Sequence, residues 1–228
     1  MVRVRTAKTG ITAAPRGTVY PVIGSRARLF ACLAAAVVAA ALALPAASPA
    51  HQVATLSGGQ LTIAGDQQNK LNDLITLDYD ASTDELVFGQ DVFGPHPSEC
   101  SPDAAQPERI IHCPASLISA IQINSGGGSD EVNANLPADM TIVVSTGAGG
   151  DSFTGGPEVD QVTMGSGSDK ADGGPGNDVI KGGSGSDKLH GGPGADSLFG
   201  GTSPDKLFGD GGKDHCVPGP GHGKEISC

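Results

Sequence analysis

The C-terminal part of the chain repeats a nine-residue pattern of glycine, polar and apolar positions. Eight consecutive units fill residues 146–217 without insertion or deletion. Position six is Asp in every unit, and position eight holds Phe153, Val162, Ala171, Ile180, Leu189, Leu198, Leu207 and Cys216. Because positions seven to nine alternate between outward, inward and outward character, each unit predicts a tight turn followed by a very short strand.

Such short strands have to stack on copies of themselves, which predicts an all-β solenoid. Two units would complete one coil, so the eight units would give four coils. A segment rich in Gly, Ser and Pro is alternatively a disordered linker. The Asp and apolar positions stay in phase over all eight units, which favours the ordered solenoid.

Residues 51–145 carry short β-type runs and no helical periodicity. We expect strands at 60–63, 74–77, 85–88, 117–123 and 141–144. Residues 125–133 form a degenerate unit with Asp130 at the expected position, and residues 65–66 and 69–73 resemble further decayed turns. This region is either irregular solenoid coils or a small β-cap, and either would cover the open edge of the stack.

Residues 1–50 have the features of a secretory signal peptide. Six basic residues precede an apolar run at 29–44, which Pro45 interrupts before a small-residue stretch that ends at Ala50. We expect cleavage after Ala50 and an extracellular location for the remainder. A membrane anchor is the alternative, but a run of 16 residues rich in Ala is short for crossing a bilayer. Lipidation at Cys32 is disfavoured because the apolar stretch follows this residue.

Acidic charge dominates the chain after the leader. The whole chain has 25 acidic and 14 basic residues, and removing the six basic residues of positions 1–50 leaves 8 basic against 25 acidic, a net charge of −17. Such a body repels nucleic acid phosphates and anionic membranes. The composition therefore excludes nucleic acid binding and favours cations as partners, with no membrane span after the leader is removed.

Four cysteines remain after the leader: Cys100, Cys113, Cys216 and Cys228. In an oxidising compartment an even number favours disulfides, and proximity in the sequence favours Cys100 with Cys113 and Cys216 with Cys228. Residues 218–228 would then be a disulfide-locked C-terminal cap. Zinc held by His96, Cys100, His112 and Cys113 is the alternative, although adjacent ligands fit the usual spacing poorly.

The Asp positions of the repeat require a cation. Residues 146–217 hold 11 acidic and five basic residues, a net charge of −6, and stacking would align the Asp carboxylates along two edges. One apolar side chain per nine residues is too little to offset the cost of ordering the backbone. Ca²⁺ meets both needs, because it takes six to eight oxygens and turns rich in Gly can add carbonyls to the carboxylates.

The units resemble the Gly-Gly-x-Gly-x-Asp-x-apolar-x nonapeptide of RTX calcium-binding proteins. Residues 173–181 match it, as do the units that start at Gly182 and Gly191, while those starting at Thr146 and Met164 depart only at position one. The resemblance implies a right-handed parallel β-roll with each ion between the turns of units two apart. One edge would stack Asp151, Asp169, Asp187 and Asp205, and the other Asp160, Asp178, Asp196 and Asp214.

These columns would define up to six calcium sites of unequal quality. Glu158 replaces a Gly in the second unit, Ser203 and Pro204 disturb the seventh, and Asp210 replaces a Gly in the eighth. The pairs Asp151/Asp169, Asp169/Asp187 and Asp178/Asp196 are therefore the best candidates. Three to four ions would bring the segment near neutrality, so we expect partial occupancy.

No catalytic constellation is present in the sequence, which predicts a protein that is not an enzyme. One alternative is a calcium-dependent polysaccharide lyase in which Arg109 or Lys70 abstracts a proton. Another is a structural or adhesive protein of the cell envelope that Ca²⁺ makes rigid. The leader and the cysteines resemble those of secreted calcium-binding repeat proteins of actinobacteria. Contact with the envelope or with polysaccharide stays open.

Lysines recur at position seven on one edge, at Lys170, Lys188 and Lys206. We expect them to solvate the roll and to temper its acidity. A ladder that binds anions is the alternative.

Overall fold

The computed structural model describes residues 53–65, 73–89, 97–105, 110–220 and 225–228. These residues form two β-sheets and, apart from one short 3₁₀ turn η1 (Ala115–Leu117), no helix. Within these ranges nothing helical is long and apolar enough to cross a bilayer. The predicted leader, Cys32, Lys70, His96 and Arg109 lie outside the described residues.

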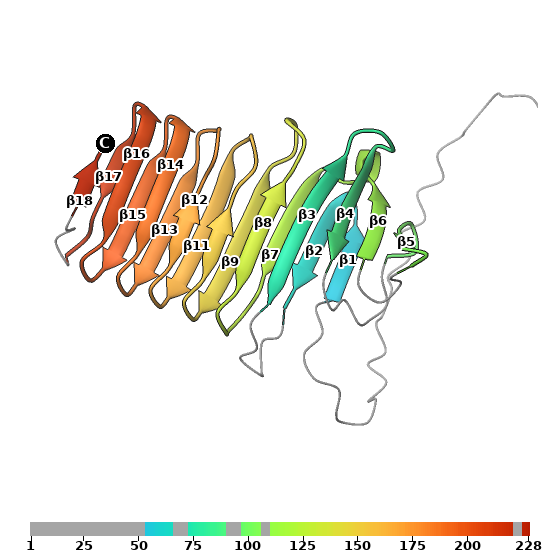
Figure 1. The fold of residues 1–228 in the computed structure, drawn as a ribbon, viewed down its shortest axis with the longest axis horizontal. Coiled ribbons are helices and arrows are strands. Elements are labelled where there is room, and N and C mark those ends of the chain that lie inside the picture. Colours follow the sequence, from blue (N-terminus) through green and yellow to red (C-terminus); the bar gives the residue numbers. More distant parts are fainter. Residues whose placement is uncertain (1–52, 66–72, 90–96, 106–109, 221–224) are drawn as a thin grey trace, which may run out of the picture. The chain divides into compact units, whose positions relative to one another are not determined.

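The two sheets contain eight and ten strands, which stack side by side along one axis (Figure 1). The first sheet runs in the order β1 (Val53–Ser57), β2 (Gln60–Ala64), β7 (Ala120–Asn124), β9 (Ile142–Ala148), β11 (Asp160–Ser166), β13 (Val179–Ser184), β15 (Ser197–Thr202) and β17 (His215–Val217). The second sheet runs in the order β18 (Glu225–Ser227), β16 (Lys206–Gly212), β14 (Lys188–Gly194), β12 (Lys170–Asp172), β10 (Ser152–Thr154), β8 (Glu131–Asn135), β3 (Leu74–Asp80), β4 (Glu85–Gly89), β6 (Ile110–Pro114) and β5 (Ser101–Pro102).

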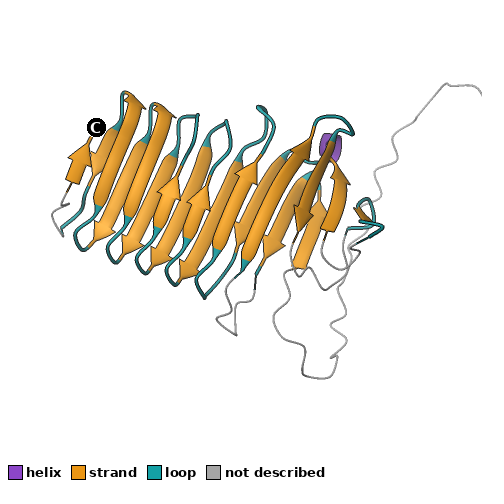
Figure 2. Ribbon diagram, in the orientation of Figure 1, coloured by secondary structure: helices purple, strands orange, loops and turns teal. Residues whose placement is uncertain are grey.

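Successive nonapeptides alternate between the two sheets. Strands two units apart pair in parallel, so Phe153 lies opposite Ala171, and Val162 lies opposite Ile180, each pair eighteen residues apart. This register confirms the prediction of an all-β parallel solenoid in which two nonapeptides form one coil. Figure 2 shows the turns, in teal, on both edges of the stack, where the strands of one sheet connect to those of the other.

The core lies between the two sheets and is built mainly from position eight. Seven of these side chains, from Phe153 to Leu207, are buried, and Cys216 packs against them as a partly buried residue. The N-terminal coils have a wider core, because most of their strands contribute two buried apolar side chains, such as Leu61 and Ile63 in β2. The apolar contribution per coil therefore falls along the chain.

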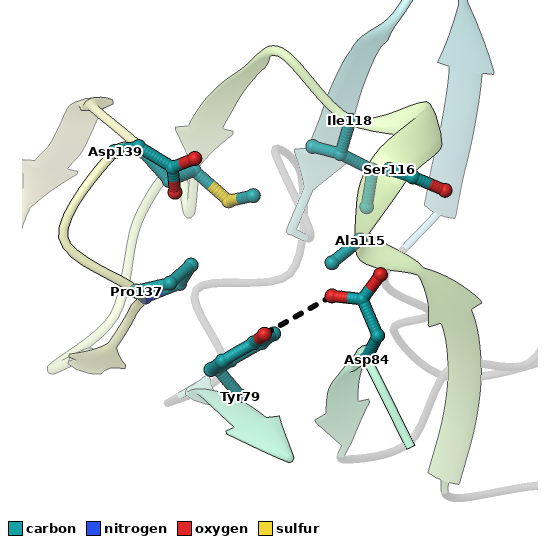
Figure 3. A pocket seen from close by; sticks show the side chains of 8 residues that line it. Tyr79, Asp84, Ala115, Ser116, Ile118, Pro137 and Asp139 are labelled. Carbon is teal, nitrogen blue, oxygen red and sulfur yellow. Dashed lines mark hydrogen bonds between the residues drawn. The ribbon is translucent and has the colours of Figure 1, made fainter. Parts of the chain in front are cut away.

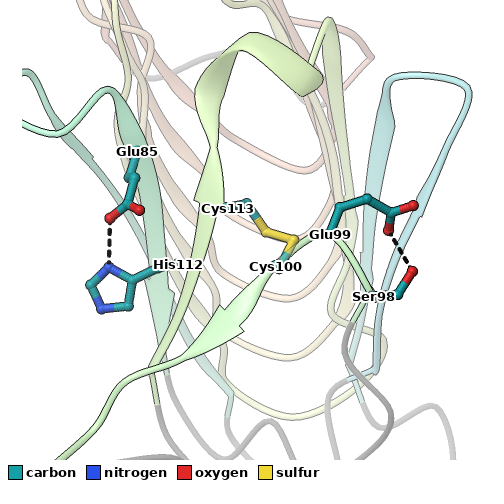
Figure 4. Close-up of a disulfide and its surroundings, with 6 residues drawn as sticks. All are labelled: Glu85, Ser98, Glu99, Cys100, His112 and Cys113. Atoms are coloured by element: carbon teal, nitrogen blue, oxygen red, sulfur yellow. Dashed lines mark hydrogen bonds and ion pairs between the residues drawn. A yellow bond between two sulfur atoms is a disulfide. The ribbon is translucent and has the colours of Figure 1, made fainter. Parts of the chain in front are cut away.

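The N-terminal end of the stack is covered by antiparallel strands. β1 pairs with β2, while β4, β6 and β5 extend the second sheet beyond β3. A disulfide between Cys100 and Cys113 joins the segment before β5 to β6, with the two Cα atoms 4.4 Å apart (Figure 4). Next to it, the imidazole of His112 lies 3.2 Å from Glu85 and 3.4 Å from Asp103. Because Cys100 and Cys113 form this disulfide, neither thiol is available to the zinc site that the sequence offered as an alternative.

A second disulfide closes the C-terminal end. Cys216 of β17 is bonded to Cys228, just after β18, so the bridge ties the last strand of the first sheet to the last strand of the second. Both predicted disulfides are present in the structure. The cystine therefore fixes the two edge strands at this end of the stack.

Glycine is required where stacked turns approach each other most closely. Gly167, at position four, has φ +147°, and a Cβ built on it would overlap the carbonyl oxygen of Gly149 in the neighbouring coil. Gly150, at position five, differs in that its Cβ would lie 3.6 Å from the nearest atom, the carbonyl oxygen of Ser168. Position five accordingly accepts Ser168 and Ala195 in other units.

We therefore expect Gly167→Ala to destabilise the roll and Gly150→Ala to leave it unchanged. The first substitution forces Ala into a left-handed backbone and against a carbonyl that cannot move without shifting the next coil, which costs about 1–3 kcal/mol. Urea denaturation of both variants in calcium-saturated buffer, followed by circular dichroism, measures the difference. Equal midpoints for the two variants would show that the turns do not stack as described.

Candidate metal centre

Two columns of aspartate carboxylates run along the stack where the turns meet the strands. The first Asp column precedes the strands of the second sheet and consists of Asp73, Asp130, Asp151, Asp169, Asp187 and Asp205. The second Asp column accompanies the strands of the first sheet and consists of Asp160, Asp178, Asp196 and Asp214. The structure thus brings the eight predicted aspartates together in two groups of four.

Hydrogen bonds connect each column from one coil to the next. In every step, the backbone N–H of one Asp donates to Oδ1 of the following Asp in its column. The distance is 2.8 Å from Asp151 to Asp169, 2.9 Å from Asp169 to Asp187 and 3.0 Å from Asp187 to Asp205. These bonds satisfy one carboxylate oxygen and set the register at two nonapeptides.

The other carboxylate oxygen is buried and has no hydrogen-bond partner among the described residues. This holds for Oδ2 of Asp130, Asp151, Asp169, Asp178, Asp187, Asp196 and Asp205, and for Oδ1 of Asp160. All eight side chains are at most 2% exposed. A buried carboxylate oxygen without a partner carries a large desolvation cost, which a bound cation would remove.

The donor set suits a hard cation. No three His, Cys, Asp or Glu side chains gather into a cluster within the part of the chain that the structure describes. A metal here would be held by carboxylates of one column together with backbone carbonyl oxygens of the stacked turns, such as those of Gly149 and Gly167. An all-oxygen set of this kind fits Ca²⁺, whose six to eight ligands need no thiolate or imidazole.

A comparison with protein families agrees with this chemistry. Residues 163–198 and residues 190–224 each match a family model, that of the RTX calcium-binding nonapeptide repeat. This model spans four copies of the nonapeptide. This segment consists of RTX repeats. RTX repeats bind calcium, so the ion that fits the oxygen donors is also the ion that the family takes. No curated protein and no solved structure matches the chain.

RTX repeats carry Gly at position one, and the structure shows the reason. A Cβ at Gly182 would overlap Oδ2 of Asp187 within the same unit. The two units that lack this Gly carry Thr146 and Met164, both fully buried. The Thr146 hydroxyl donates to the carbonyl oxygen of Met164 over 2.7 Å, so these two units make an additional contact within the protein.

The units with irregular turns keep the backbone of an RTX repeat. Ser203 stands at position four with φ +84° and Asp210 at position two with φ +65°, the left-handed region that Gly occupies at equivalent positions. Non-glycine residues adopt this region only at an energetic cost. The seventh and eighth units therefore retain the fold with strained turns.

The first Asp column extends beyond the RTX match. The N–H of Asp130 donates to Asp151 over 2.8 Å, and the N–H of Asp73 donates to Asp130 over 2.8 Å. The degenerate unit at residues 125–133 indicated Asp130 in the sequence. Asp73 was missed as a column member, because 57 residues separate it from Asp130 and no nonapeptide surrounds it.

Burial raises the pKa of seven aspartates of the two columns. The pKa of Asp160 rises to about 7, and those of Asp169 and Asp178 rise to about 6. Loss of solvation is the largest cause in each, and the charge of the next Asp in the column adds to it, while backbone N–H donors act in the opposite direction. The pKa rises for the same first reason in Asp130, Asp187, Asp196 and Asp205.

A cavity of about 370 Å³ lies near the end of β3, away from Asp73 at its start. Its lining includes Tyr79, Asp84, Ser116 and Asp139 (Figure 3). The Tyr79 hydroxyl donates to Asp84 over 3.0 Å, and this bond raises the pKa of Tyr79. Among the described residues, the lining contains carboxylates and hydroxyls but no cationic side chain and no thiol.

Without calcium, acidification is expected to stabilise the roll. A raised carboxyl pKa means that the folded state binds more protons than the unfolded state between about pH 4, where a free Asp titrates, and about pH 7. The free energy of unfolding should therefore increase as the pH falls from about 7.5 to about 5. Circular dichroism of calcium-depleted protein from pH 7.5 to pH 5, followed by urea denaturation wherever the strand signal shows a folded roll, measures this change.

With saturating Ca²⁺ the expected sign is opposite, because carboxylate ligands must be deprotonated to bind the ion. Calcium-loaded protein should lose stability over the same acidification. If ion-free protein also became less stable on acidification, the burial of the Asp columns would be in doubt.

Proposed function

We propose that this chain is a secreted calcium-binding repeat protein whose C-terminal roll folds when Ca²⁺ binds between its stacked turns. The observation that carries the proposal is the row of buried carboxylate oxygens without a hydrogen-bond partner in both Asp columns. The RTX repeats at residues 163–224 supply the identity of the ion. The position-six aspartates from Asp151 to Asp214 would hold it together with turn carbonyls.

Binding and folding are coupled in this proposal because the apolar core of the repeats is thin. Each nonapeptide buries one side chain at position eight, such as Leu189 or Leu198. Unneutralised carboxylates in one column repel each other, and their burial opposes folding at neutral pH. Ca²⁺ supplies the positive charge, and its binding free energy becomes part of the folding free energy. An affinity of about 10⁻⁴–10⁻³ M would delay folding until the chain is outside the cell.

The role of the folded roll in this proposal is structural and calcium-binding, without catalysis. The cavity beside Tyr79 is consistent with this role, because the described residues of its lining include no cationic group and no activated nucleophile. The Asp columns are buried in the stack, where a substrate has no access to them.

Substitution of a single column member tests the site. Asp187 lies between Asp169 and Asp205, so Asp187→Asn should remove charge from two neighbouring candidate sites. We expect fewer bound ions by calorimetry and a several-fold higher calcium concentration at the midpoint of the circular dichroism transition. Asp172→Asn is the matched control, because it makes the same change in net charge at an exposed position outside the columns.

Two results would contradict the proposal. One is a calcium titration that produces no gain of strand signal in wild-type protein. The other is an Asp187→Asn variant that binds as many ions as Asp172→Asn does. The first would reject calcium-coupled folding, and the second would reject the Asp columns as the site.

Export is tested separately. The two disulfides support an oxidising compartment, and the leader is expected to be removed after Ala50. Intact-mass measurement of protein recovered from the culture medium should give a chain that begins at His51 with both bridges formed. A reduced, full-length chain confined to the cells would contradict secretion without affecting the calcium site.

A further inference from the structure

The turn before Asp130 lies outside the RTX match but stacks on the first nonapeptide as a further coil. Residues 125–130 connect β7 to β8 on the edge of the stack where the first Asp column runs. Figure 1 shows β8 within the continuous stack, between β3 and β10. The matched residues begin at 163, so neither Asp130 nor Asp151 belongs to them. We call residues 125–130 the junction turn.

The backbone of the junction turn meets the next turn in the way that two nonapeptide turns meet. A Cβ built on Gly149 would overlap the carbonyl oxygen of Gly128, just as a Cβ on Gly167 would overlap that of Gly149. The N–H of Gly128 donates to the carbonyl oxygen of Ala148 over 2.8 Å. One coil further on, the N–H of Gly149 donates to that of Ser166 over the same distance. The junction turn therefore presents equivalent backbone groups to its neighbour.

Two buried carboxylate oxygens between these turns lack a partner. Asp130 and Asp151 are each 2% exposed, and Oδ2 of both has no hydrogen-bond partner among the described residues. The N–H of Asp130 donates to Oδ1 of Asp151 over 2.8 Å, the same bond that joins the aspartates of the nonapeptides. Burial of an unpartnered carboxylate oxygen costs free energy that a hard cation would remove. The pair thus offers the same kinds of oxygen ligand as the nonapeptide pairs do.

Three additional residues interrupt the period without changing the junction turn. Across the first edge, the core residues Ile123 and Val132 are nine positions apart, as in a nonapeptide. Across the other edge, Val132 and Val144 are twelve positions apart. The additional residues therefore lie between β8 and β9, on the edge away from Asp130. On that edge Ile142 stands in the register position of Asp160, so only the first Asp column extends to this coil.

We propose that Asp130 and Asp151, with carbonyl oxygens of their turns, hold a further Ca²⁺ ion and that this site fills first. The inference rests on the proposed calcium-binding function and adds a site to it. Strands β3 and β8 each bury two apolar side chains, as Ile75 and Leu77 do in β3, so an apolar core supports the junction turn. Binding there has to order one turn, whereas a site between two nonapeptides begins with two turns on a thin core. The lower ordering cost raises the affinity, and the bound ion becomes the starting point from which the roll grows.

Asp130→Asn tests the site. Asn keeps the oxygen that accepts the N–H of Asp73 but removes the charge and the second carboxylate oxygen. Glu131→Gln is the matched control, because it makes the same change in net charge at the next residue, which is exposed. Calorimetry should show one bound ion fewer in Asp130→Asn than in Glu131→Gln. The midpoint calcium concentration of its strand signal should be at least about threefold higher than that of Asp205→Asn, which alters the C-terminal member of the same column.

Hydrogen exchange of the wild-type protein tests the order of filling without a substitution. Amide protection in the turn at residues 147–152 should appear at a lower calcium concentration than protection in the equivalent turn at residues 183–188. Exchange followed by mass spectrometry over a calcium titration measures both turns in the same sample. This measurement decides the proposal even if Asp130→Asn fails to fold.

The outcomes separate this proposal from the proposed function. Loss of one ion in Asp130→Asn, together with early protection of residues 147–152, supports it. Equal ion numbers in Asp130→Asn and Glu131→Gln would overturn it, and a loss of ions in Asp187→Asn would then show that the nonapeptide sites remain. Simultaneous protection of the two turns, or earlier protection of residues 183–188, would also overturn it. A wild-type protein that binds no calcium would contradict the proposed function itself.

Discussion

The structure depends on carboxylates that are buried in register and only half satisfied. Along each column the backbone N–H of one Asp donates to the carboxylate of the next, as Asp169 does to Asp187, and these bonds set the register of the turns. In eight aspartates of the two columns the other carboxylate oxygen has no hydrogen-bond partner among the described residues. The same arrangement thus sets the register of the fold and leaves buried oxygens unsatisfied, and in the proposed function a bound cation would satisfy them and offset the buried charge.

Different contacts stabilise the two ends of the stack. Toward the N-terminus, most strands bury two apolar side chains, such as Ile121 and Ile123 of β7, and the Ser125 hydroxyl donates to the carbonyl oxygen of Thr146. Toward the C-terminus, each strand buries a single side chain at position eight, and Gly replaces Thr and Met at position one. Apolar burial therefore decreases along the chain, and in the proposed function the ion would contribute a larger share of the stability there. A disulfide fixes the end where the core is thinnest.

The sequence allowed prediction of the fold and of the two Asp columns wherever the nine-residue period is unbroken. Eight in-phase aspartates, together with the resemblance to RTX repeats, predicted which aspartates share a column and the eighteen-residue pairing. Prediction was poorer where coils differ in length. Asp130 pairs with Asp151 across 21 residues and Asp73 with Asp130 across 57, so no fixed period connects them. The strand expected at 117–123 begins at Ala120 because η1 occupies the residues before it, and Leu117 is 43% exposed.

The strand register also shows which residues are neighbours, and the composition of the repeat does not. Residues nine apart in the sequence lie on opposite sheets, whereas residues eighteen apart are neighbours, so only alternate units share a surface. A net charge of −6 over the repeat describes neither surface nor interior: acidic side chains occupy the buried columns, and three lysines meet on one outer face. Because a bound cation would offset the charge of the buried columns, the electrostatic potential outside the roll would then depend mainly on the exposed side chains of the two outer faces.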